Sequence, residues 1–231
     1  MISLNKVTFK WHANDAKPTL NIPALCIKSG EHIFLHGPSG SGKSTLLALL
    51  AGINTPSSGD VIILNNNLNT LTNSQRDVFR AENIGYIFQN FNLLPYLTPI
   101  ENVTLGCEFS KKRKQHALDT VKPINTLQNA AARLLNALGL DNQYHHKDVA
   151  SLSIGQQQRV AAARAFIGSP KLIIADEPTS ALDTANRESF IKLLFEQASQ
   201  ANSTLVFVSH DETLKPLFNR SIDLLTIQEQ S

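Results

Sequence analysis

The stretch Gly37-Pro38-Ser39-Gly40-Ser41-Gly42-Lys43-Ser44-Thr45 decides the fold of this chain, because it fits the phosphate-loop pattern G-x-x-x-x-G-K-[ST]. The pattern requires a strand before it and a helix after it. Ile33-Phe34-Leu35 predicts the strand, and Lys43 to Ala51 has helical character. Glycines let backbone N–H groups turn inward as an anion nest, to which the helix adds the positive end of its dipole. The sequence therefore predicts a phosphate-binding loop.

The side chains of this loop fit a nucleoside triphosphate and magnesium. Lys43 places a charge on the β- and γ-phosphates, and the hydroxyl of Ser44 can ligate Mg²⁺. The motif predicts these nucleotide-binding residues: Gly37, Pro38, Ser39, Gly40, Ser41, Gly42, Lys43, Ser44 and Thr45. The loop alone establishes nucleotide binding, and it leaves kinases, GTPases and motors open.

The composition is close to that of an ordinary globular protein. The chain has 231 residues, of which 42% are hydrophobic and 17% charged, and this suits one large α/β domain or two small ones. A formal net charge of +2 is too small to indicate nucleic acid or an anionic membrane surface as a partner. Cys26 and Cys107 lack CxxC spacing, so neither a disulfide framework nor a zinc site is indicated.

The sequence shows neither a signal peptide nor a membrane span. Residues 1–6 lack the apolar stretch of a signal peptide. The most apolar segment, Leu46 to Ile53, is broken at Gly52 and falls short of the roughly 20 residues that a spanning helix needs. If the protein works at a membrane, we expect it to do so from the aqueous side.

The remaining pattern predicts one α/β domain with a helical insert at about residues 90–155. Leu172 to Ala175 and Leu205 to Val208 are continuous apolar runs, typical of central strands in a parallel sheet. Further strands are predicted at Ile2–Phe9, Leu20–Ile27 (at an edge, because of Pro23), Val61–Leu64 and Ile84–Phe88. Helices are predicted from Thr98, at Thr126–Leu138, Gly155–Ile167 and Asn186–Ala198. Ser110 to Lys122 is polar and is expected to be a surface excursion.

Two carboxylates follow the apolar run that ends at Ala175. Asp176 falls at the carboxyl edge of the predicted sheet, where ligands bind, and is expected to hold Mg²⁺ directly or through water. Glu177 points elsewhere and is placed to orient and polarise an attacking water. The alternative is a solvated acidic turn before Pro178.

The segment Leu152-Ser153-Ile154-Gly155-Gln156-Gln157-Gln158-Arg159-Val160 predicts a second helix N-terminus with a serine cap. The alternative is an ordinary capped helix. The segment resembles the LSGGQ signature of ABC (ATP-binding cassette) ATPases, with Ile154 in place of the first glycine. On this resemblance Ser153, Gly155 and Gln156 contact nucleotide. Two phosphate-binding surfaces in one domain suggest that two copies meet head to tail as a homodimer.

The resemblance to ABC ATPases extends over essentially the whole chain. Gln89 matches the Q-loop, which links the γ-phosphate and Mg²⁺ to a membrane partner. Ser180 to Asp183 resembles the D-loop, which reaches across the dimer, and His210 matches the switch histidine on the γ-phosphate. Trp11 sits where the family keeps an aromatic residue against adenine, although a lone tryptophan is more often packing.

This resemblance implies a P-loop NTPase with a RecA-like core, an antiparallel β subdomain and a helical subdomain, in one domain over residues 1–231. The core and β subdomain take about residues 1–89 and 156–231, and the helical signature subdomain takes about 90–155. The cofactors implied are ATP and Mg²⁺. The site residues implied are Glu177, His210 and Gln89 for catalysis, Ser44, Gln89 and Asp176 for the metal, and Trp11, Ser153, Gly155, Gln156 and Asp183 for the nucleotide, besides the phosphate loop. Glu108 to Gln128 looks longer than usual for the family.

Within the family, Ile84 to Val103 resembles most closely the ATPases of lipoprotein-releasing and macrolide-export systems, and Arg76 and Arg80 support this grouping. Polar amino-acid importers share parts of the stretch and are the alternative. The grouping implies peripheral attachment, through a separate permease, to the cytoplasmic face of the bacterial inner membrane. A permease helix is expected in a groove bordered by Phe91, Leu93, Leu94 and Tyr96.

Two classes of ABC protein without a permease fit the sequence less well. A soluble protein acting on ribosomes normally carries two cassettes in one chain, and a DNA-repair ATPase shows long heptad stretches that this sequence lacks. The basic run at residues 111–114 is interpreted as a solvated loop, with lipid headgroups as the alternative and no nucleic acid partner. Cargo selectivity lies in the permease rather than in this chain, and the transport direction is inferred from the subgroup alone.

Overall fold

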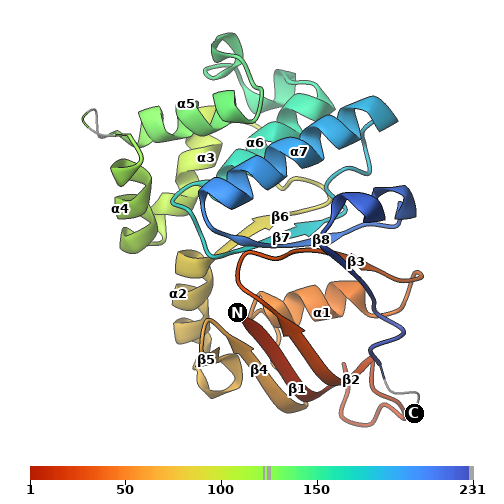
Figure 1. Ribbon diagram of the computed structural model, residues 1–231. Helices are drawn as coiled ribbons and strands as arrows, with labels where there is room; N and C mark the ends of the chain where they lie inside the picture. The colour runs from red at the N-terminus through yellow and green to blue at the C-terminus, as the bar shows by residue number, and fades with distance from the viewer. Residues whose placement is uncertain (122, 124–125, 229–231) are drawn as a thin grey trace.

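The computed structural model describes residues 1–121, 123 and 126–228 and contains two sheets (Figure 1). The antiparallel sheet has the order β2-β1-β4-β5, from β1 (Ile2–Phe9), β2 (Leu20–Ile27), β4 (Ser58–Ile63) and β5 (Asn66–Asn67). The parallel sheet has the order β6-β7-β8-β3-β9, from β3 (His32–His36), β6 (Ile84–Ile87), β7 (Leu172–Asp176), β8 (Thr204–Val208) and β9 (Arg220–Asp223). The predicted α/β class is confirmed, and β2 is an edge strand, as Pro23 indicated.

The central strands of the parallel sheet are buried on both faces. In β7, Leu172 and Ile174 join one hydrophobic core, and Ile173 and Ala175 join the other. Successive side chains of a strand point to opposite faces, so a continuous apolar run is needed where both faces are covered. The two apolar runs predicted as central strands are therefore confirmed as β7 and β8.

Helices cover the parallel sheet on both faces. Helix α1 (Lys43–Leu50) lies between the two sheets and shares a core with both (Figure 1). The opposite face is covered by α3 (Pro99–Glu108), α5 (Leu127–Ala137), α6 (Ile154–Phe166) and α7 (Thr184–Gln200). Helix α2 (Asn73–Asn83) precedes β6, and α4 (Lys111–Asp119) follows α3. Short 3₁₀ helices are η1 (Leu68–Thr70), η2 (Asn142–Tyr144), η3 (Val149–Ser151) and η4 (Glu212–Leu217).

Local signals set most of the helix ends. Thr98 begins α3 in a capping box with Glu101, and Thr126 caps α5, as predicted. After α5, Gly139 takes φ +78, a conformation that suits glycine at a helix end. Helices α3, α4 and α5 all fall between residues 90 and 155, and the subdomain boundaries at these positions stay a prediction.

The segment Ser110 to Lys122, expected to be a surface excursion, contains helix α4, and most of the side chains of this helix are exposed. Ser110 caps α4, whose Arg113 and Ala117 are buried; Lys122 lies outside the described residues. The prediction that the basic run at residues 111–114 is solvated is therefore wrong at Arg113. Its charge gave no indication in the sequence that the side chain is buried. A smaller difference concerns the strand predicted to end at Leu64, which ends at Ile63 because Leu64 has a left-handed backbone with φ +50.

Candidate active site

One cavity of about 370 Å³ brings together residues that are far apart in the sequence. The phosphate loop follows β3, Gln89 follows β6, the two acids lie at the end of β7, and His210 follows β8, so these four segments lie at the carboxyl edge of the parallel sheet. Thr19 joins them from the connection between β1 and β2. Ligands of open parallel sheets bind at this edge. The lining residues are Thr19, Ser39, Gly40, Gly42, Lys43, Ser44, Thr45, Gln89, Asp176, Glu177 and His210.

The phosphate loop leaves the start of α1 open. Gly42 is the N-cap residue, with φ +97 and no side chain to cap the helix. A Cβ at Gly42 would lie 2.6 Å from Cδ2 of Leu20 and 3.1 Å from the carbonyl oxygen of Thr19, so glycine is required for both conformation and space. The first N–H groups of α1 are therefore presented to the cavity as an anion site.

The ammonium of Lys43 is held over the loop by backbone carbonyls. Its Nζ donates to the carbonyl oxygen of Gly37 at 2.7 Å and to that of Pro38 at 2.9 Å. Burial lowers the pKa of Lys43, and the nearby carboxylates of Glu177 and Asp176 oppose this shift. The charge thus lies pre-oriented beside the helix end. Gly37, Pro38 and Ser41 do not line the cavity, and Ser41 is buried with an Oγ that has no partner among the described residues.

Asp176 ends β7 inside the cavity. Burial raises its pKa, and Lys43, His210 and a hydrogen bond from the hydroxyl of Tyr86 partly offset the shift. The same surroundings raise the pKa of Tyr86, so its phenol stays protonated and donates. Sequence analysis missed Tyr86, because only the pairing of β6 with β7 brings it next to the acid strand. It also missed Thr19, for which the sequence carries no motif signal.

Glu177 has an unusual backbone for a residue other than glycine. Its φ is +49, and its N–H donates to the carbonyl oxygen of Val208 at 3.0 Å. Such left-handed positions are strained and concentrate at functional sites. Burial raises the pKa of Glu177, which His210 opposes. Its Oε1 lies 3.3 Å from Nε2 of His210 yet makes no well-directed hydrogen bond to any described residue. This buried oxygen therefore keeps capacity to accept a hydrogen bond beside the imidazole of His210.

The oxygen donors in this cavity fit magnesium. The Ser44 hydroxyl, the Gln89 amide and the Asp176 carboxylate all line it, and oxygen ligands are those that Mg²⁺ prefers. Across the described parts of the chain, no group of three or more His, Cys, Asp or Glu is arranged to hold a metal. The donor set therefore suits an ion that also keeps phosphate and water ligands, rather than a dedicated protein cage.

The signature residues lie in a second cavity, of about 440 Å³, which shares no lining residue with the first. Ser153 caps α6, and Ser153, Gly155 and Gln156 line this cavity together with Asp183. Asp183 caps α7 by accepting from the N–H of Asn186 at 3.0 Å. A single chain therefore does not bring these four residues to the phosphate loop.

The signature turn leaves room beside Gly155. A Cβ at Gly155 would meet only Cδ2 of Leu182, at 3.6 Å, which is an ordinary contact. Ile154 is 55% exposed, so this side chain does not enter the core in place of the usual glycine. Packing within the chain thus does not require glycine at 155.

Trp11 does not line either cavity. It is 59% exposed and meets the ring of Phe9 edge-on, with ring centroids 5.0 Å apart. The exposure argues against a role in the core, and stacking on adenine stays a prediction. Among the helices that the structure describes, none combines the length and the apolar character required to cross a membrane.

Comparison with known proteins identifies the relatives of this chain. The family model described as ABC transporter matches residues 20–180. The uncharacterized ABC transporter ATP-binding protein YbbA of Escherichia coli K12 is 40% identical over 206 residues, covering 89% of this chain and 86% of that protein. The lipoprotein-releasing system ATP-binding protein LolD of Cytophaga hutchinsonii is 38% identical, covering 85% and 84%. The dimeric post-hydrolysis structure of the ATP-binding cassette MJ0796 with ADP and Pi has a TM-score of 0.81 at 33% identity, covering 96% and 94%.

Proposed function

The chain belongs to the ABC transporter family and is an ATPase, and we propose that it is the subunit that drives a separate permease of the lipoprotein-release or macrolide-export type. The observation that carries the proposal is the first cavity, where the phosphate loop, Gln89, Asp176, Glu177 and His210 meet. The likeness to a lipoprotein-releasing ATP-binding protein supports the subgroup. The protein would then be peripheral, on the cytoplasmic face of the inner membrane.

In this proposal each residue of the cavity has a separate task. The N–H groups of α1 and Lys43 bind the β- and γ-phosphates, and Ser44, Gln89 and Asp176 hold Mg²⁺, which neutralises phosphate charge when bound. Glu177 accepts a hydrogen bond from the attacking water and so orients it toward the γ-phosphate. His210, whose Nε2 lies 3.3 Å from Oε1 of Glu177, would hydrogen-bond to the same γ-phosphate.

The central test is ATP binding by Lys43→Ala. Removing the charge leaves the phosphates uncompensated, and we expect binding to weaken by about 10²–10³-fold. Lys28→Ala is the matched control, because Lys28 is exposed and does not line the cavity. Titration calorimetry with Mg-ATP measures both, and equal affinity of Lys43→Ala and wild type would contradict the assignment.

A second copy of the chain completes the site in this proposal. Ser153, Gly155, Gln156 and Asp183 lie together in a cavity apart from the phosphate loop, and a Cβ at Gly155 would meet only an ordinary contact. The MJ0796 cassette with ADP and Pi is described as dimeric, which supports a dimer here. Head-to-tail association would set the signature of one chain against the phosphate loop of the other.

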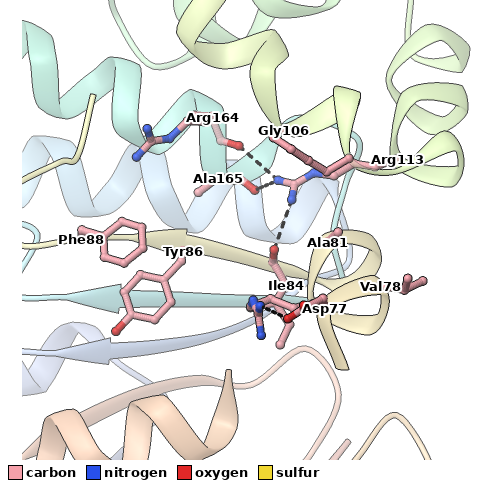
Figure 2. A pocket seen from close by; sticks show the side chains of 12 residues that line it. Asp77, Val78, Ala81, Ile84, Tyr86, Phe88, Gly106, Arg113, Arg164 and Ala165 are labelled. Atoms are coloured by element: carbon pink, nitrogen blue, oxygen red, sulfur yellow. Dashed lines mark hydrogen bonds and ion pairs between the residues drawn. The ribbon is translucent and has the colours of Figure 1, made fainter. Parts of the chain in front are cut away.

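The permease contact is better placed in a different groove from the one indicated by sequence. Phe91 and Leu93 pack against the core of the helical layer, and only Tyr96 of that segment is an exposed aromatic, at 73%. A groove of about 510 Å³ lies instead between α2, β6, α3, α4 and α6 (Figure 2). Val78 and Phe109, 55% and 73% exposed, line it together with Phe88. Such an apolar groove fits a short permease helix.

The groove is tested by membrane fractionation with the permease encoded beside the gene. Val78→Glu and Phe109→Glu should release the chain from membranes and leave its ATPase activity without permease unchanged, because neither residue lines the nucleotide cavity. Tyr96→Glu is the matched control at an exposed aromatic outside the groove. Retention of both groove variants on membranes would contradict this docking site, and a wild-type chain that never fractionates with the permease would contradict the permease partner.

A further inference from the structure

The C-terminal half of α6 sends one arginine to the turn that follows Gln89. Nη1 of Arg164 donates to the carbonyl oxygen of Asn92 at 2.6 Å, and Nη2 donates to that of Phe91 at 2.5 Å. Burial lowers the pKa of Arg164, and within the described residues its guanidinium makes no ion pair. One planar fork thus binds two successive carbonyls, a geometry that a lysine cannot reproduce.

The turn that Arg164 holds is not a relaxed one. Phe91 and Asn92 have φ +58 and +50, two successive left-handed residues of which neither is glycine. This conformation is costly and persists only where surrounding structure supports it. The N–H of Phe91 donates to the carbonyl oxygen of Phe88 at 3.0 Å, so the turn starts one residue before Gln89. The position of Gln89 therefore depends on this turn.

A second arginine fixes the end of α6 to the start of the strand that leads to Gln89. Arg113 of α4 donates to the carbonyl oxygens of Ala165 at 2.6 Å, Arg164 at 3.1 Å and Ile84 at 3.2 Å (Figure 2). It also donates to the carbonyl oxygen of Ile167 at 2.6 Å. Burial lowers its pKa to about 10, and the carbonyls at the negative end of α6 replace a carboxylate partner. In Figure 2 the guanidinium of Arg164 points away from this cluster. Helix α6 is thus anchored to β6 at one point and to the Gln89 turn at another.

We propose that Arg164 is a positioning residue, which makes the signature helix and the Gln89 turn move as one body. Ser153 begins α6 and Arg164 lies near its end, so a displacement of the signature reaches Gln89 through one helix and two hydrogen bonds. This rests on the proposed function, in which Ser153 and Gln89 act on nucleotide. The ammonium of a lysine at 164 would reach one carbonyl and free the turn.

Hydrogen exchange directly tests the clamp, by which we mean the two hydrogen bonds from Arg164 to the carbonyl oxygens of Phe91 and Asn92. In Arg164→Lys, the amides of Phe91 and Asn92 should exchange about tenfold faster than in the wild type, because a charge-assisted bond that supports the turn is lost. Arg159→Lys is the matched control: Arg159 lies on the same helix and donates to the carbonyl oxygen of Leu138, away from this turn. Wild-type exchange at residues 91 and 92 in Arg164→Lys, or equal acceleration in both variants, would overturn the clamp.

A double-mutant cycle tests the link to Gln89. Arg164→Lys should lower kcat about tenfold with KM for ATP within about twofold, since the phosphate loop is untouched. Combined with Gln89→Ala, it should add less than about a further twofold, because both changes disable the same group. Fully additive losses would overturn the positioning role. If Gln89→Ala alone leaves kcat unchanged, the role proposed for Gln89 fails, and the exchange experiment still decides the clamp.

Discussion

The two helix N-termini proposed to bind the nucleotide, those of α1 and α6, are built in opposite ways. Helix α1 begins at Gly42, which has no side chain and leaves the first N–H groups uncapped. Helix α6 begins at Ser153, whose Oγ accepts from the N–H of Gln156 at 3.3 Å, while Oε1 of Gln156 accepts from the N–H of Ser153 at 2.9 Å. The first N–H groups of α1 therefore have no side-chain acceptor, whereas the N-terminus of α6 is capped by its own side chains.

This difference explains a division of labour. An uncapped helix end with glycines around it and Lys43 beside it is an anion site in a single chain. A closed capping box gains less from an anion, because binding competes with bonds that already exist. We therefore expect α1 to supply binding, and α6 to contribute only when a second copy presents the nucleotide to it.

The largest effect expected concerns the two ends acting together. Ser153→Arg puts a bulky cation at the start of α6 and should abolish hydrolysis while ATP still binds at Lys43. Lys43→Ala should abolish hydrolysis by itself. Mixing the two variants yields a dimer with one intact site, and random pairing restores about a quarter of the wild-type rate if one site suffices. Activity measured on a strictly monomeric species would rule out the shared site.

The next largest effect concerns the hydrolysis step alone, with nucleotide binding at both helix ends left intact. Glu177→Gln keeps the shape of the side chain but removes the acceptor that polarises water, so kcat should fall about 10²–10⁴-fold with ATP affinity retained. Gel filtration with ATP should then show an accumulated dimer, because both ends still bind. A near-normal rate would move the catalytic role to His210, the residue 3.3 Å from Glu177.

A matched pair of glycine substitutions sharpens the comparison. Gly42→Ala must adopt φ +97 and crowd Leu20, and it should weaken ATP binding at least tenfold and lower stability by about 1–3 kcal/mol. Gly155→Ala meets only an ordinary contact with Leu182, so it should fold and bind ATP as the wild type does. Its hydrolysis should fall, because the methyl group occupies space kept for the second copy. Calorimetry and thermal unfolding separate these results, and equal loss of binding in both variants would contradict the model.

The capping boxes allow a smaller test at α6 alone. Ser153→Ala and Thr98→Ala each remove an N-cap hydroxyl from a capping box, and each should cost about 1 kcal/mol, or roughly 2–4 °C in Tm. Only Ser153→Ala should also reduce hydrolysis, since Thr98 begins α3 and lines neither nucleotide cavity. If both variants keep full activity, the hydroxyl of Ser153 serves the helix and not the nucleotide.

The smallest effect is electrostatic and belongs to the cavity at α1. Burial raises the pKa of Glu177, so the ionised carboxylate destabilises the free protein. Below the pKa that Glu177 has in the unfolded chain, the carboxyl group is protonated in both states and causes no destabilisation. As pH rises through the higher pKa of the folded protein, the buried group ionises and the folded protein becomes less stable. Glu177→Gln should therefore raise Tm near pH 8, by less than either cap substitution lowers it, with no difference near pH 4. A constant difference across this range would assign the effect to packing.

Much of the site was predictable because its residues carry local signals. The spacing of glycines before Lys43, the two acids after an apolar run, and the polar caps before helices each act within a few residues, and the structure places them in the predicted elements. Arg113 was missed for the opposite reason. Its acceptors are carbonyls of β6 and α6, which no side-chain pattern reveals, and a run of four basic residues suggested solvent instead.

The location of the groove could not be predicted for a related reason. An apolar residue in a sequence is equally consistent with a core and with a binding surface. Phe91 and Leu93 are partly buried against the core, whereas Val78 and Phe109 stayed exposed beside a cavity, because the packing of α2, α3 and α4 decides which side chains are covered.

By itself the sequence determined the backbone chemistry of this protein: a left-handed glycine at the start of α1, a serine cap at α6, and acids at the end of β7. These features depend on the sterics and hydrogen bonds of neighbouring residues. Only the tertiary structure decided which distant residues lie together. It put Gln89, Asp176, Glu177 and His210 around one cavity, kept the signature residues in another, and set Arg164 of α6 against the carbonyl oxygens of Phe91 and Asn92. Such contacts arise from burial between distant segments, which local spacing does not encode.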